Sequence, residues 1–396
     1  MSIDYREKIK TMLKDFLTRT NASDLYIRKK PSVRDGGYII TIPGLEELTP
    51  QELADVMKEI IKWRYKDENT INRLFSEAMF ENKELDLAIQ IPQTQIRARV
   101  NIYKSMGMLQ AVLRKIPSNI PKLEELGFQE IHLNAILNAV GKREGLVLVT
   151  GQTGTGKSTT LASIINYLNE NVNKHIITVE DPVEFKHDEK KCLVTQREVG
   201  HNADTQTFHK GLVAALRQAP DIILVGEMRD QETATAAMHA AQTGHIVFAT
   251  LHTNSAPETV LRIIDMFPTK KEKTIKVSLA SSLLMIISQK LVPNTKNKRS
   301  LCYEIMLNNS AISNIIIQEA SPEKKILQKM IECQTEGQIP FNYLLVRKIR
   351  DGEISVEKAM EFSNDREQLV KLMENFDKQA NGSGGSGSTQ GKNKFL

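Results

Sequence analysis

Segment 151–159 constrains the fold of this chain more than any other part of the sequence. It reads GQTGTGKST and fits the pattern G-x-x-x-x-G-K-[ST], in which glycines let successive backbone amides converge on phosphate groups. A β-rich apolar run, 146–150, precedes it, and a helix-like run, 157–169, follows it. Strand, glycine loop and helix in this order predict a nucleoside triphosphate site, with the helix N-terminus adding partial positive charge at the phosphates.

Different residues of this segment are expected to bind different parts of a nucleoside triphosphate and its Mg²⁺ ion. Lys157 is expected to reach the β- and γ-phosphates, and the hydroxyl of Ser158 is the expected ligand of Mg²⁺. A glycine-rich turn with a chance Lys-Ser pair is the alternative, and the flanking strand and helix argue against it. The expected nucleotide-binding residues are Gly151, Thr153, Gly154, Thr155, Gly156, Lys157, Ser158 and Thr159.

Length and composition predict two domains in a reducing cytoplasm. The chain has 396 residues, enough for two cores, and no cationic-then-apolar leader opens it. Cys192, Cys302 and Cys333 are widely spaced, which favours neither disulfides nor a zinc site. The most apolar stretch, 279–287, is too short to span a bilayer and predicts a buried helix. A net charge of +5 suits an anionic membrane surface or an acidic partner without identifying either.

The N-terminal part predicts a small α+β domain. Residues 1–20 form an amphipathic pattern, and a strand over 24–28 followed by Asp-Gly-Gly and 38–42 indicates a hairpin. Thr49 and Glu52 flank Pro50 as a capping box, which predicts the start of a helix. Two more alternating segments, 85–91 and 95–103, predict another antiparallel pair.

From about residue 139 the pattern changes to strands alternating with helices. Continuous apolar runs are typical of strands that are buried on both faces of a mainly parallel sheet. They occur at 146–150, 175–180, 221–226 and 245–250, and helical patterns continue over 322–372. The predicted organisation is an N-terminal domain (1–117), a linker (118–138), an α/β domain (139–372) and a Gly/Ser-rich flexible tail (373–396).

Three further segments place acids and histidines near the expected phosphate site. Segment 178–184 ends a predicted strand with carboxylates, and the apolar strand 222–226 ends in Glu227, an element like Walker B with Glu in place of Asp. His245 and His252 bracket the last of these strands. Ligands of open parallel sheets lie beyond the carboxyl ends of the strands, so we expect Glu184, Glu227 and His252 to gather near the γ-phosphate.

These segments resemble the Walker A, Asp box, Walker B and His box of the PilT/PilU group of secretion ATPases, which drive type IV pilus retraction. The resemblance spans about 23–372, and the run 352–365 is closer to PilU. It includes further matches at 23–25, 97–101, 116–117, 123–127, 196–200 and 226–230. The implied fold is an N-terminal PAS-like domain and a C-terminal RecA-like ATPase domain with C-terminal helices. The implied assembly is a homohexamer that hydrolyses ATP with Mg²⁺ at subunit interfaces.

The resemblance also implies roles for the acids and histidines. Glu184 would polarise the attacking water as general base, and Glu227 would organise Mg²⁺, directly or through water. His252 would sense the γ-phosphate, and His245 would support the site from the other end of its strand. The implied partners are an inner-membrane pilus platform protein and a second PilT-type motor, which places the chain at the cytoplasmic face of the membrane.

Phosphoryl transfer also needs positive charge opposite the phosphate loop, and an arginine from a neighbouring subunit can supply it. Arg97, Arg99 and Arg114 lie on segments that match the arginine-bearing strands of the family. Arg97 and Arg99 are expected on the same strand face because side chains alternate. A solvated strand edge is the alternative reading of the two arginines.

The sequence departs from the family in three places. Segment 311–319 lacks both arginines of the family's AIRNLIRE-type motif, segment 335–341 replaces its LGMQTF run, and Tyr26 replaces a histidine. None of these positions belongs to the predicted phosphate site. The departures therefore bear on the output of the motor, and ATP hydrolysis is better supported than retraction.

The sequence leaves three alternative functions open. A pilus assembly or type II secretion ATPase would share the fold, although those relatives carry a tetracysteine subdomain that is absent here. A RecA-like nucleic-acid motor would fit the net positive charge of the chain, which would attract phosphate groups. Against this, aromatic residues make up only 5% of the chain, and no basic stripe interleaved with aromatics is visible. A protein that binds ATP only to assemble would hydrolyse none.

Overall fold

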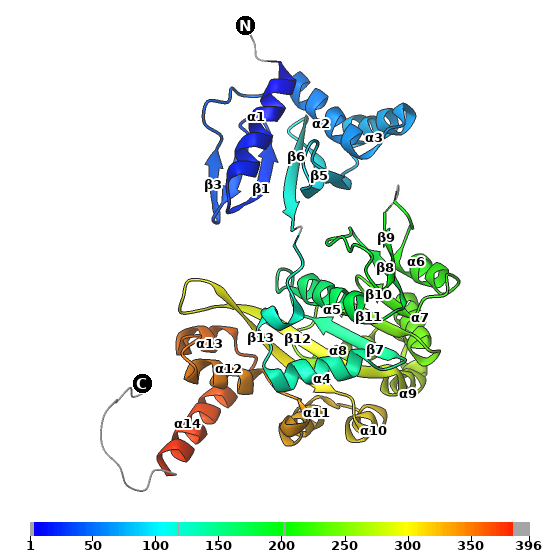
Figure 1. Cartoon of the computed structure of the whole chain (residues 1–396), viewed down its shortest axis with the longest axis vertical. Helices are drawn as coiled ribbons and strands as arrows, with labels where there is room; N and C mark the ends of the chain where they lie inside the picture. Colours follow the sequence, from blue (N-terminus) through cyan, green and yellow to red (C-terminus); the bar gives the residue numbers. More distant parts are fainter. Residues whose placement is uncertain (1–3, 118, 201–202, 383–396) are drawn as a thin grey trace. The chain divides into compact units, whose positions relative to one another are not determined.

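The computed structural model describes residues 4–117, 119–200 and 203–382 (Figure 1). The Gly/Ser-rich run of the expected tail, 383–396, lies outside the described residues. The chain divides into two compact units, the first made of 1–120 with 181–186 and the second of 121–180 with 187–396.

The first unit is an antiparallel sheet with helices on one face (Figure 1). Its strands run in the order β3-β2-β1-β6-β5-β4. The strands are β1 (Ala22–Ile27), β2 (Ser32–Asp35), β3 (Tyr38–Thr41), β4 (Leu85–Gln90), β5 (Arg97–Ser105) and β6 (Met108–Ile116), and the helices are α1 (Tyr5–Thr18), α2 (Pro50–Arg64) and α3 (Glu68–Phe80).

The alternation of the strands explains why the helices pack on one face of this sheet. Leu25, Val100 and Leu113 are buried in one core with apolar residues of α1, α2 and α3, while the side chains between them point to the opposite face. The predicted capping box of α2 is confirmed, since the Thr49 hydroxyl accepts a hydrogen bond from the Glu52 amide and the Glu52 carboxylate accepts one from the Thr49 amide.

The expected hairpin between 24–28 and 38–42 is wrong in its pairing. The turn at Gly36 and Gly37 joins β2 to β3, and β1 pairs instead with β2 and β6. The short strand β2 was not predicted, because Pro31 and charged neighbours interrupt its apolar pattern. It leaves β3 at the edge of the sheet.

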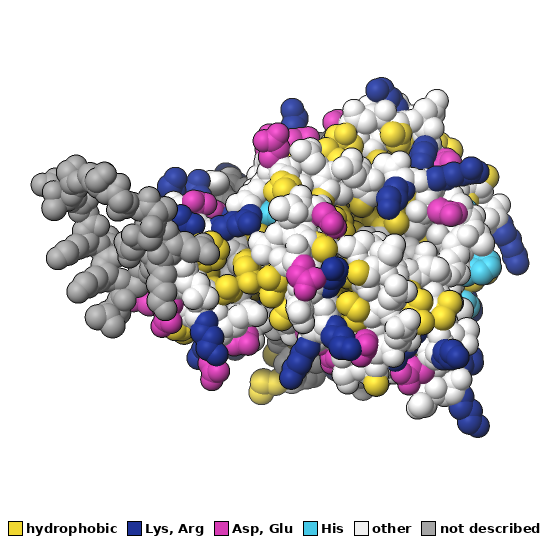
Figure 2. Space-filling model, turned by 90° about the horizontal axis from the view of Figure 1, so that it is seen from below, with side chains coloured by type: hydrophobic (Ala, Val, Ile, Leu, Met, Phe, Trp, Pro, Cys, Tyr) yellow, Lys and Arg dark blue, Asp and Glu magenta, His cyan; other side chains and the backbone are white. Residues whose placement is uncertain are grey.

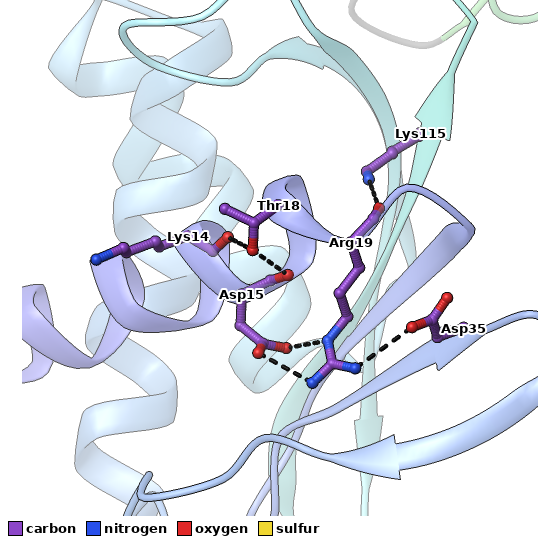
Figure 3. Close-up of polar contacts among 6 residues, drawn as sticks. All are labelled: Lys14, Asp15, Thr18, Arg19, Asp35 and Lys115. Carbon is purple, nitrogen blue, oxygen red and sulfur yellow. Dashed lines mark hydrogen bonds and ion pairs between the residues drawn. The ribbon is translucent and has the colours of Figure 1, made fainter.

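An ion-pair network fixes the end of α1 against this sheet (Figure 3). The Arg19 guanidinium donates from Nε and Nη2 to the carboxylate of Asp15, and from Nη1 to Asp35 on β2 at 3.3 Å. Lys115 on β6 donates to the Arg19 carbonyl oxygen at 3.3 Å (Figure 3). One arginine therefore ties the last turn of the helix to two strands.

The second unit is built on a seven-stranded sheet in the order β13-β12-β7-β11-β10-β8-β9. All neighbours pair in parallel except β12 and β13, which are antiparallel. The strands are β7 (Gly145–Thr150), β8 (His175–Glu180), β9 (Leu193–Glu198), β10 (Ile222–Val225), β11 (Ile246–Leu251), β12 (Leu283–Pro293) and β13 (Arg299–Leu307).

Helices cover both faces of this sheet, as continuous apolar strands require. Val147 and Val149 of β7 belong to one core cluster, whereas Leu146 and Leu148 belong to the other. The first cluster is closed by α4 (Glu130–Val140), α5 (Lys157–Asn171), α12 (Phe341–Arg350), α13 (Val356–Phe362) and α14 (Arg366–Gly382), and the second by α6 (Phe208–Ala215), α7 (Gln231–Gln242), α8 (Ala256–Asp265), α9 (Glu272–Ser282), α10 (Ser310–Gln318) and α11 (Glu323–Glu332). The predicted class, an α+β domain with an α/β domain, is confirmed.

The structure differs from the sequence prediction at three boundaries. Stretch 279–287 is not one helix, because α9 ends at Ser282 and β12 begins at Leu283. Segment 121–138, expected in the linker, belongs to the second unit, since Leu123 and Ile136 are buried in its core. Residues 373–382, expected in the tail, continue α14.

A buried carboxylate holds two helices of the second unit. Glu304 on β13 accepts a hydrogen bond from the Ala256 amide at the start of α8 at 2.6 Å, and one from the Phe341 amide at the start of α12 at 3.1 Å. The residue is 3% exposed, and burial raises the pKa of its carboxyl. Glu304 thus satisfies backbone donors that a helix N-terminus leaves unpaired.

The surface seen from below in Figure 2 mixes Lys and Arg with Asp and Glu, and no single-sign patch dominates that face. Among the described residues, no helix has the length and apolar character needed to cross a membrane.

Candidate active site

The phosphate loop lies between β7 and α5, as the sequence predicts. Gly151, Gly154 and Gly156 have positive φ angles of 142°, 80° and 89°. A Cβ atom on Gly151 would lie 2.4 Å from the Gln289 carbonyl oxygen, so no larger residue fits there. Gly156 caps α5 without a side-chain hydrogen bond, which leaves the first amides of the helix to bind an anion.

Lys157 is the first residue of α5, and its side chain reaches back to this loop. Its ammonium donates to the carbonyl oxygens of Gly151 at 2.6 Å and Gln152 at 3.0 Å. The residue is 9% exposed, so its charge is concentrated where the loop amides converge. Ser158 and Thr159 follow in the first turn of α5, half-buried. Thr153 and Thr155 belong to the loop itself, where the Thr155 hydroxyl donates to the Gln152 carbonyl oxygen.

Gln289 on β12 supports the loop from the neighbouring strand. Its side-chain amide donates to the Thr155 carbonyl oxygen at 2.8 Å and accepts from the Thr160 hydroxyl at 3.0 Å. The residue is 1% exposed. This role is not predictable from the sequence, because a single polar residue inside an apolar run carries no motif.

Replacement of Gln289 by alanine is expected to weaken ATP binding about tenfold, because losing two hydrogen bonds worth roughly 0.5–1.5 kcal/mol each loosens the loop before binding. Titration with a fluorescent ATP analogue measures the affinity. Gln242→Ala, which removes an exposed glutamine bonded to Ser281, is the matched control. Equal affinities in both variants would contradict this role for Gln289.

Lys290, the next residue of β12, holds the C-terminal segment. Its ammonium donates to the Phe362 carbonyl oxygen at 2.9 Å and to the Asn364 side chain at 2.5 Å, and lies over the Phe341 ring at 4.7 Å. The Asn364 amide donates to the Asn254 carbonyl oxygen at 3.3 Å. These contacts join the C-terminal helices to the strand that supports the loop.

A cavity of about 400 Å³ lies beside the loop. It is lined by loop residues, by β12 and β13 and by the end of α13, including Gln152, Thr153, Lys290, Arg299 and Phe362. Its walls combine cationic, hydroxyl and apolar groups. That combination suits a phosphorylated molecule with an apolar ring.

Glu227 and His252 meet at the carboxyl edge of the same sheet. His252 Nε2 lies 3.4 Å from a Glu227 carboxylate oxygen, and Arg229 Nη2 donates to the other at 2.7 Å. Burial acts to raise the pKa of Glu227, but hydrogen bonds and charge from Arg229, with His252, outweigh burial and lower this pKa. Glu227 is therefore a carboxylate at neutral pH. No sequence motif indicates that Arg229 is the partner of Glu227.

Contacts along this edge join the acid to the phosphate loop. Strands β10, β11 and β7 are parallel neighbours, and the Gln152 side chain donates to Asn254, two residues after His252, at 3.2 Å. Ser158 and Glu227 carry oxygen atoms of the hard type that Mg²⁺ prefers.

His245 lies at the opposite edge. It precedes β11, whereas His252 follows it, and a six-residue strand separates edges by about 20 Å. Its ring Nδ1 lies 3.0 Å from the Ala240 carbonyl oxygen. Any contribution of His245 to the site must pass through the strand.

The other predicted site residues belong to the first unit. Glu184 is exposed, and Arg97 Nη1 donates to the carbonyl oxygen of its neighbour Val183 at 2.9 Å. Arg99 lies 3.9 Å from Asp86, and Arg114 Nε donates to Asp24 at 2.6 Å. Arg97 and Arg99 share a strand face, as predicted.

Two relatives from Pseudomonas aeruginosa match almost the whole chain. The protein named "Type IV pilus retractation ATPase PilT" is 40% identical and is aligned over 92% of this chain and 99% of its own. The protein named "Type IV pilus ATPase PilU" is 35% identical, over 90% of each chain.

A solved structure described as the pilus retraction motor PilT with bound ADP superposes with a TM-score of 0.80. It is 38% identical and covers 92% of this chain and 99% of its own. The structure of the Legionella pneumophila ATPase DotB, 28% identical, has a TM-score of 0.71 over 92% of this chain and 95% of its own.

The predicted resemblance is confirmed by these relatives and by the match of a whole family to most of the sequence. That family, described as Type II/IV secretion system protein, matches residues 7–382. This chain belongs to the type II/IV secretion system protein family and is a homologue of the PilT and PilU pilus ATPases.

Proposed function

We propose that this chain is a hexameric ATPase that hydrolyses ATP with Mg²⁺ to power type IV pilus retraction. The observation that carries the proposal is the arrangement at one sheet edge, where the loop around Lys157 lies beside the carboxylate of Glu227 and the ring of His252. The similarity to PilT over nearly the whole chain supports the same reaction. In this proposal the chain acts at the cytoplasmic face of the inner membrane, on a pilus platform protein.

The roles of the residues follow from the chemistry of phosphoryl transfer. The loop amides and Lys157 bind the β- and γ-phosphates. Ser158 and Glu227 would hold Mg²⁺, which would offset the charge of the phosphates. Glu184 accepts a hydrogen bond from the attacking water, and His252 responds to the γ-phosphate through Glu227. Arginines of the N-terminal domain of a second copy complete the positive charge, which makes hydrolysis depend on assembly.

The departures in α10 favour an accessory role beside a PilT-type motor. Where the family motif has arginines, this chain has Ser313 and Ile317. The Ser313 hydroxyl donates a hydrogen bond to the Ala280 carbonyl oxygen within the same unit. Two cations are therefore missing from this surface. We propose that a second motor supplies that contact, as in a PilU-like arrangement, and the resemblance at 352–365 supports this.

Replacement of Glu184 by glutamine is expected to lower kcat about 100-fold, because a neutral amide cannot accept a proton and general-base catalysis contributes about 10²–10⁴. Phosphate release measures the rate. Glu170→Gln, at an exposed carboxylate paired with Lys190, is the control and should retain the rate. If the unmodified protein and Glu184→Gln both release phosphate only at the background rate, the protein is not an ATPase and binds the nucleotide only to assemble. Equal rates above background would instead exclude Glu184 as the general base.

Deletion of the gene separates retraction from the alternatives. More surface pili with less twitching supports retraction, whereas loss of pili indicates the assembly ATPase. Salt-sensitive binding of single-stranded DNA would instead indicate the nucleic-acid motor.

A further inference from the structure

Four charged side chains form a row on the face of the N-terminal sheet that is opposite its helices. Asp24 on β1 lies opposite Arg34 on β2 and opposite Arg114 on β6, and Arg114 in turn lies opposite Arg99 on β5. All four point away from the core, because each lies next in sequence to a buried apolar residue. The row carries one negative and three positive charges.

Asp24 is the buried member of this row. Its side chain is 2% exposed, although it ends in a carboxylate. One oxygen accepts from Arg114 Nε at 2.6 Å, and the other accepts from the Ser23 hydroxyl at 2.8 Å with Arg34 Nε at 3.5 Å. A buried carboxylate is costly unless it is paired. Asp24 therefore has a strong preference for keeping a guanidinium in place.

The two flanking arginines are held differently. Arg34 donates from Nε and Nη2 to the Tyr26 hydroxyl at 3.0 and 2.8 Å, which occupies its fork. Arg114 is 67% exposed, and among the described residues its side chain donates only through Nε, to Asp24. Its two terminal nitrogens, which form the fork that matches phosphate oxygens, remain available.

We propose that Asp24 is a positioning residue for hydrolysis, which holds Arg114 by Nε so that its terminal nitrogens face the triphosphate bound by a second copy of this chain. The inference rests on the proposed function, in which an arginine of the N-terminal domain completes the neighbouring site. An anchored guanidinium has fewer rotamers to lose when it binds the transferring phosphate, so the benefit falls on the transition state.

The test is steady-state ATP hydrolysis by the full chain with Asp24→Asn. We expect kcat to fall about tenfold or more while KM changes less than about twofold, the split that marks a transition-state contact. Asp35→Asn is the matched control, because it removes the charge from another aspartate–arginine pair of the same sheet (Figure 3). It should leave both constants unchanged. An Asp24→Asn enzyme with unchanged kcat overturns the proposal.

Arg114→Lys tests the same idea at an exposed side chain, in case Asp24→Asn fails to fold. Lysine keeps the charge, but one ammonium cannot bind Asp24 through Nε and also offer a fork to phosphate. We expect kcat close to that of Arg114→Ala. A lysine variant as fast as the unmodified protein overturns the anchored-fork proposal.

Mixed assemblies test whether Arg114 acts on a second copy. Asp24→Asn subunits keep Lys157, and Lys157→Ala subunits keep the anchored arginine, so mixing them should give more activity than either alone. No gain in an assembly shown to contain both subunits overturns the proposal. If Arg114→Ala is inactive but Asp24→Asn is not, only the positioning role fails. If Arg114→Ala is also fully active, the arginine assignment in the proposed function fails.

Discussion

Replacement of Lys157 by alanine is expected to lower kcat/KM for ATP by about 10³-fold or more, because a charge-assisted contact to phosphate and its strengthening in the transition state are both lost. The structure supports a large effect, since the ammonium is nearly buried and held by two carbonyl oxygens of the loop. No other lysine of the loop can substitute for it. Phosphate release and ATP titration, measured together, separate lost binding from lost chemistry.

Lys142→Ala is the control for this prediction, because it removes an exposed lysine of the same domain. It should retain full activity. Lys157→Ala should still melt within a few degrees of the unmodified protein if the loss is chemical rather than structural. Hydrolysis by Lys157→Ala at the normal rate would mean that the phosphate site lies elsewhere.

Replacement of Glu304 by alanine is expected to reduce the free energy of unfolding by about 2–5 kcal/mol, because two buried backbone donors lose their acceptor at about 1–3 kcal/mol each. Both donors lie at helix N-termini, where an alanine cannot replace the carboxylate and water has little access. Urea unfolding measures the change. Glu367→Ala, at an exposed carboxylate in the first turn of α14, should change the free energy by less than about 0.5 kcal/mol.

The pH dependence of Glu304 gives a second check. Burial raises the pKa of this carboxyl in the folded state, so its contribution to stability is complete below the unfolded pKa of about 4.3 and is lost as pH rises through the folded value. The stability of the unmodified protein minus that of Glu304→Gln should therefore decrease as pH rises above about 4.3. A difference that grows with pH would contradict the raised pKa.

The sequence predicted those elements whose signals are local. The phosphate loop, with β7 before it and α5 after it, follows from glycine spacing and an apolar run, and the capping box predicts the start of α2. In contrast, the start of β12 was predicted as part of a helix. The reason is that α9 ends at Ser282 and β12 begins at Leu283, so no loop separates the two elements. The polar residues Ser288 and Gln289 further obscure the strand pattern of β12.

The proximity of Glu227 and His252 was predictable, because each follows the carboxyl end of one of two apolar strands that pair in parallel. The site was not predictable where contacts join distant segments. Asp24 and Arg114 are separated by 90 positions in the chain, and only the register of β1 against β6 brings them together. Gln289 likewise reaches the phosphate loop across 134 positions, so neither spacing nor residue type indicates its partner.

Two adjacent residues of strand β12 contact two different parts of the second unit. Gln289 is bonded to the backbone of the phosphate loop and Lys290 to the segment between α13 and α14. A displacement of the loop along this strand must therefore either break a buried hydrogen bond or shift the C-terminal helices with it. A shift of the phosphate loop can thus be transmitted through β12 to the C-terminal helices of the same unit.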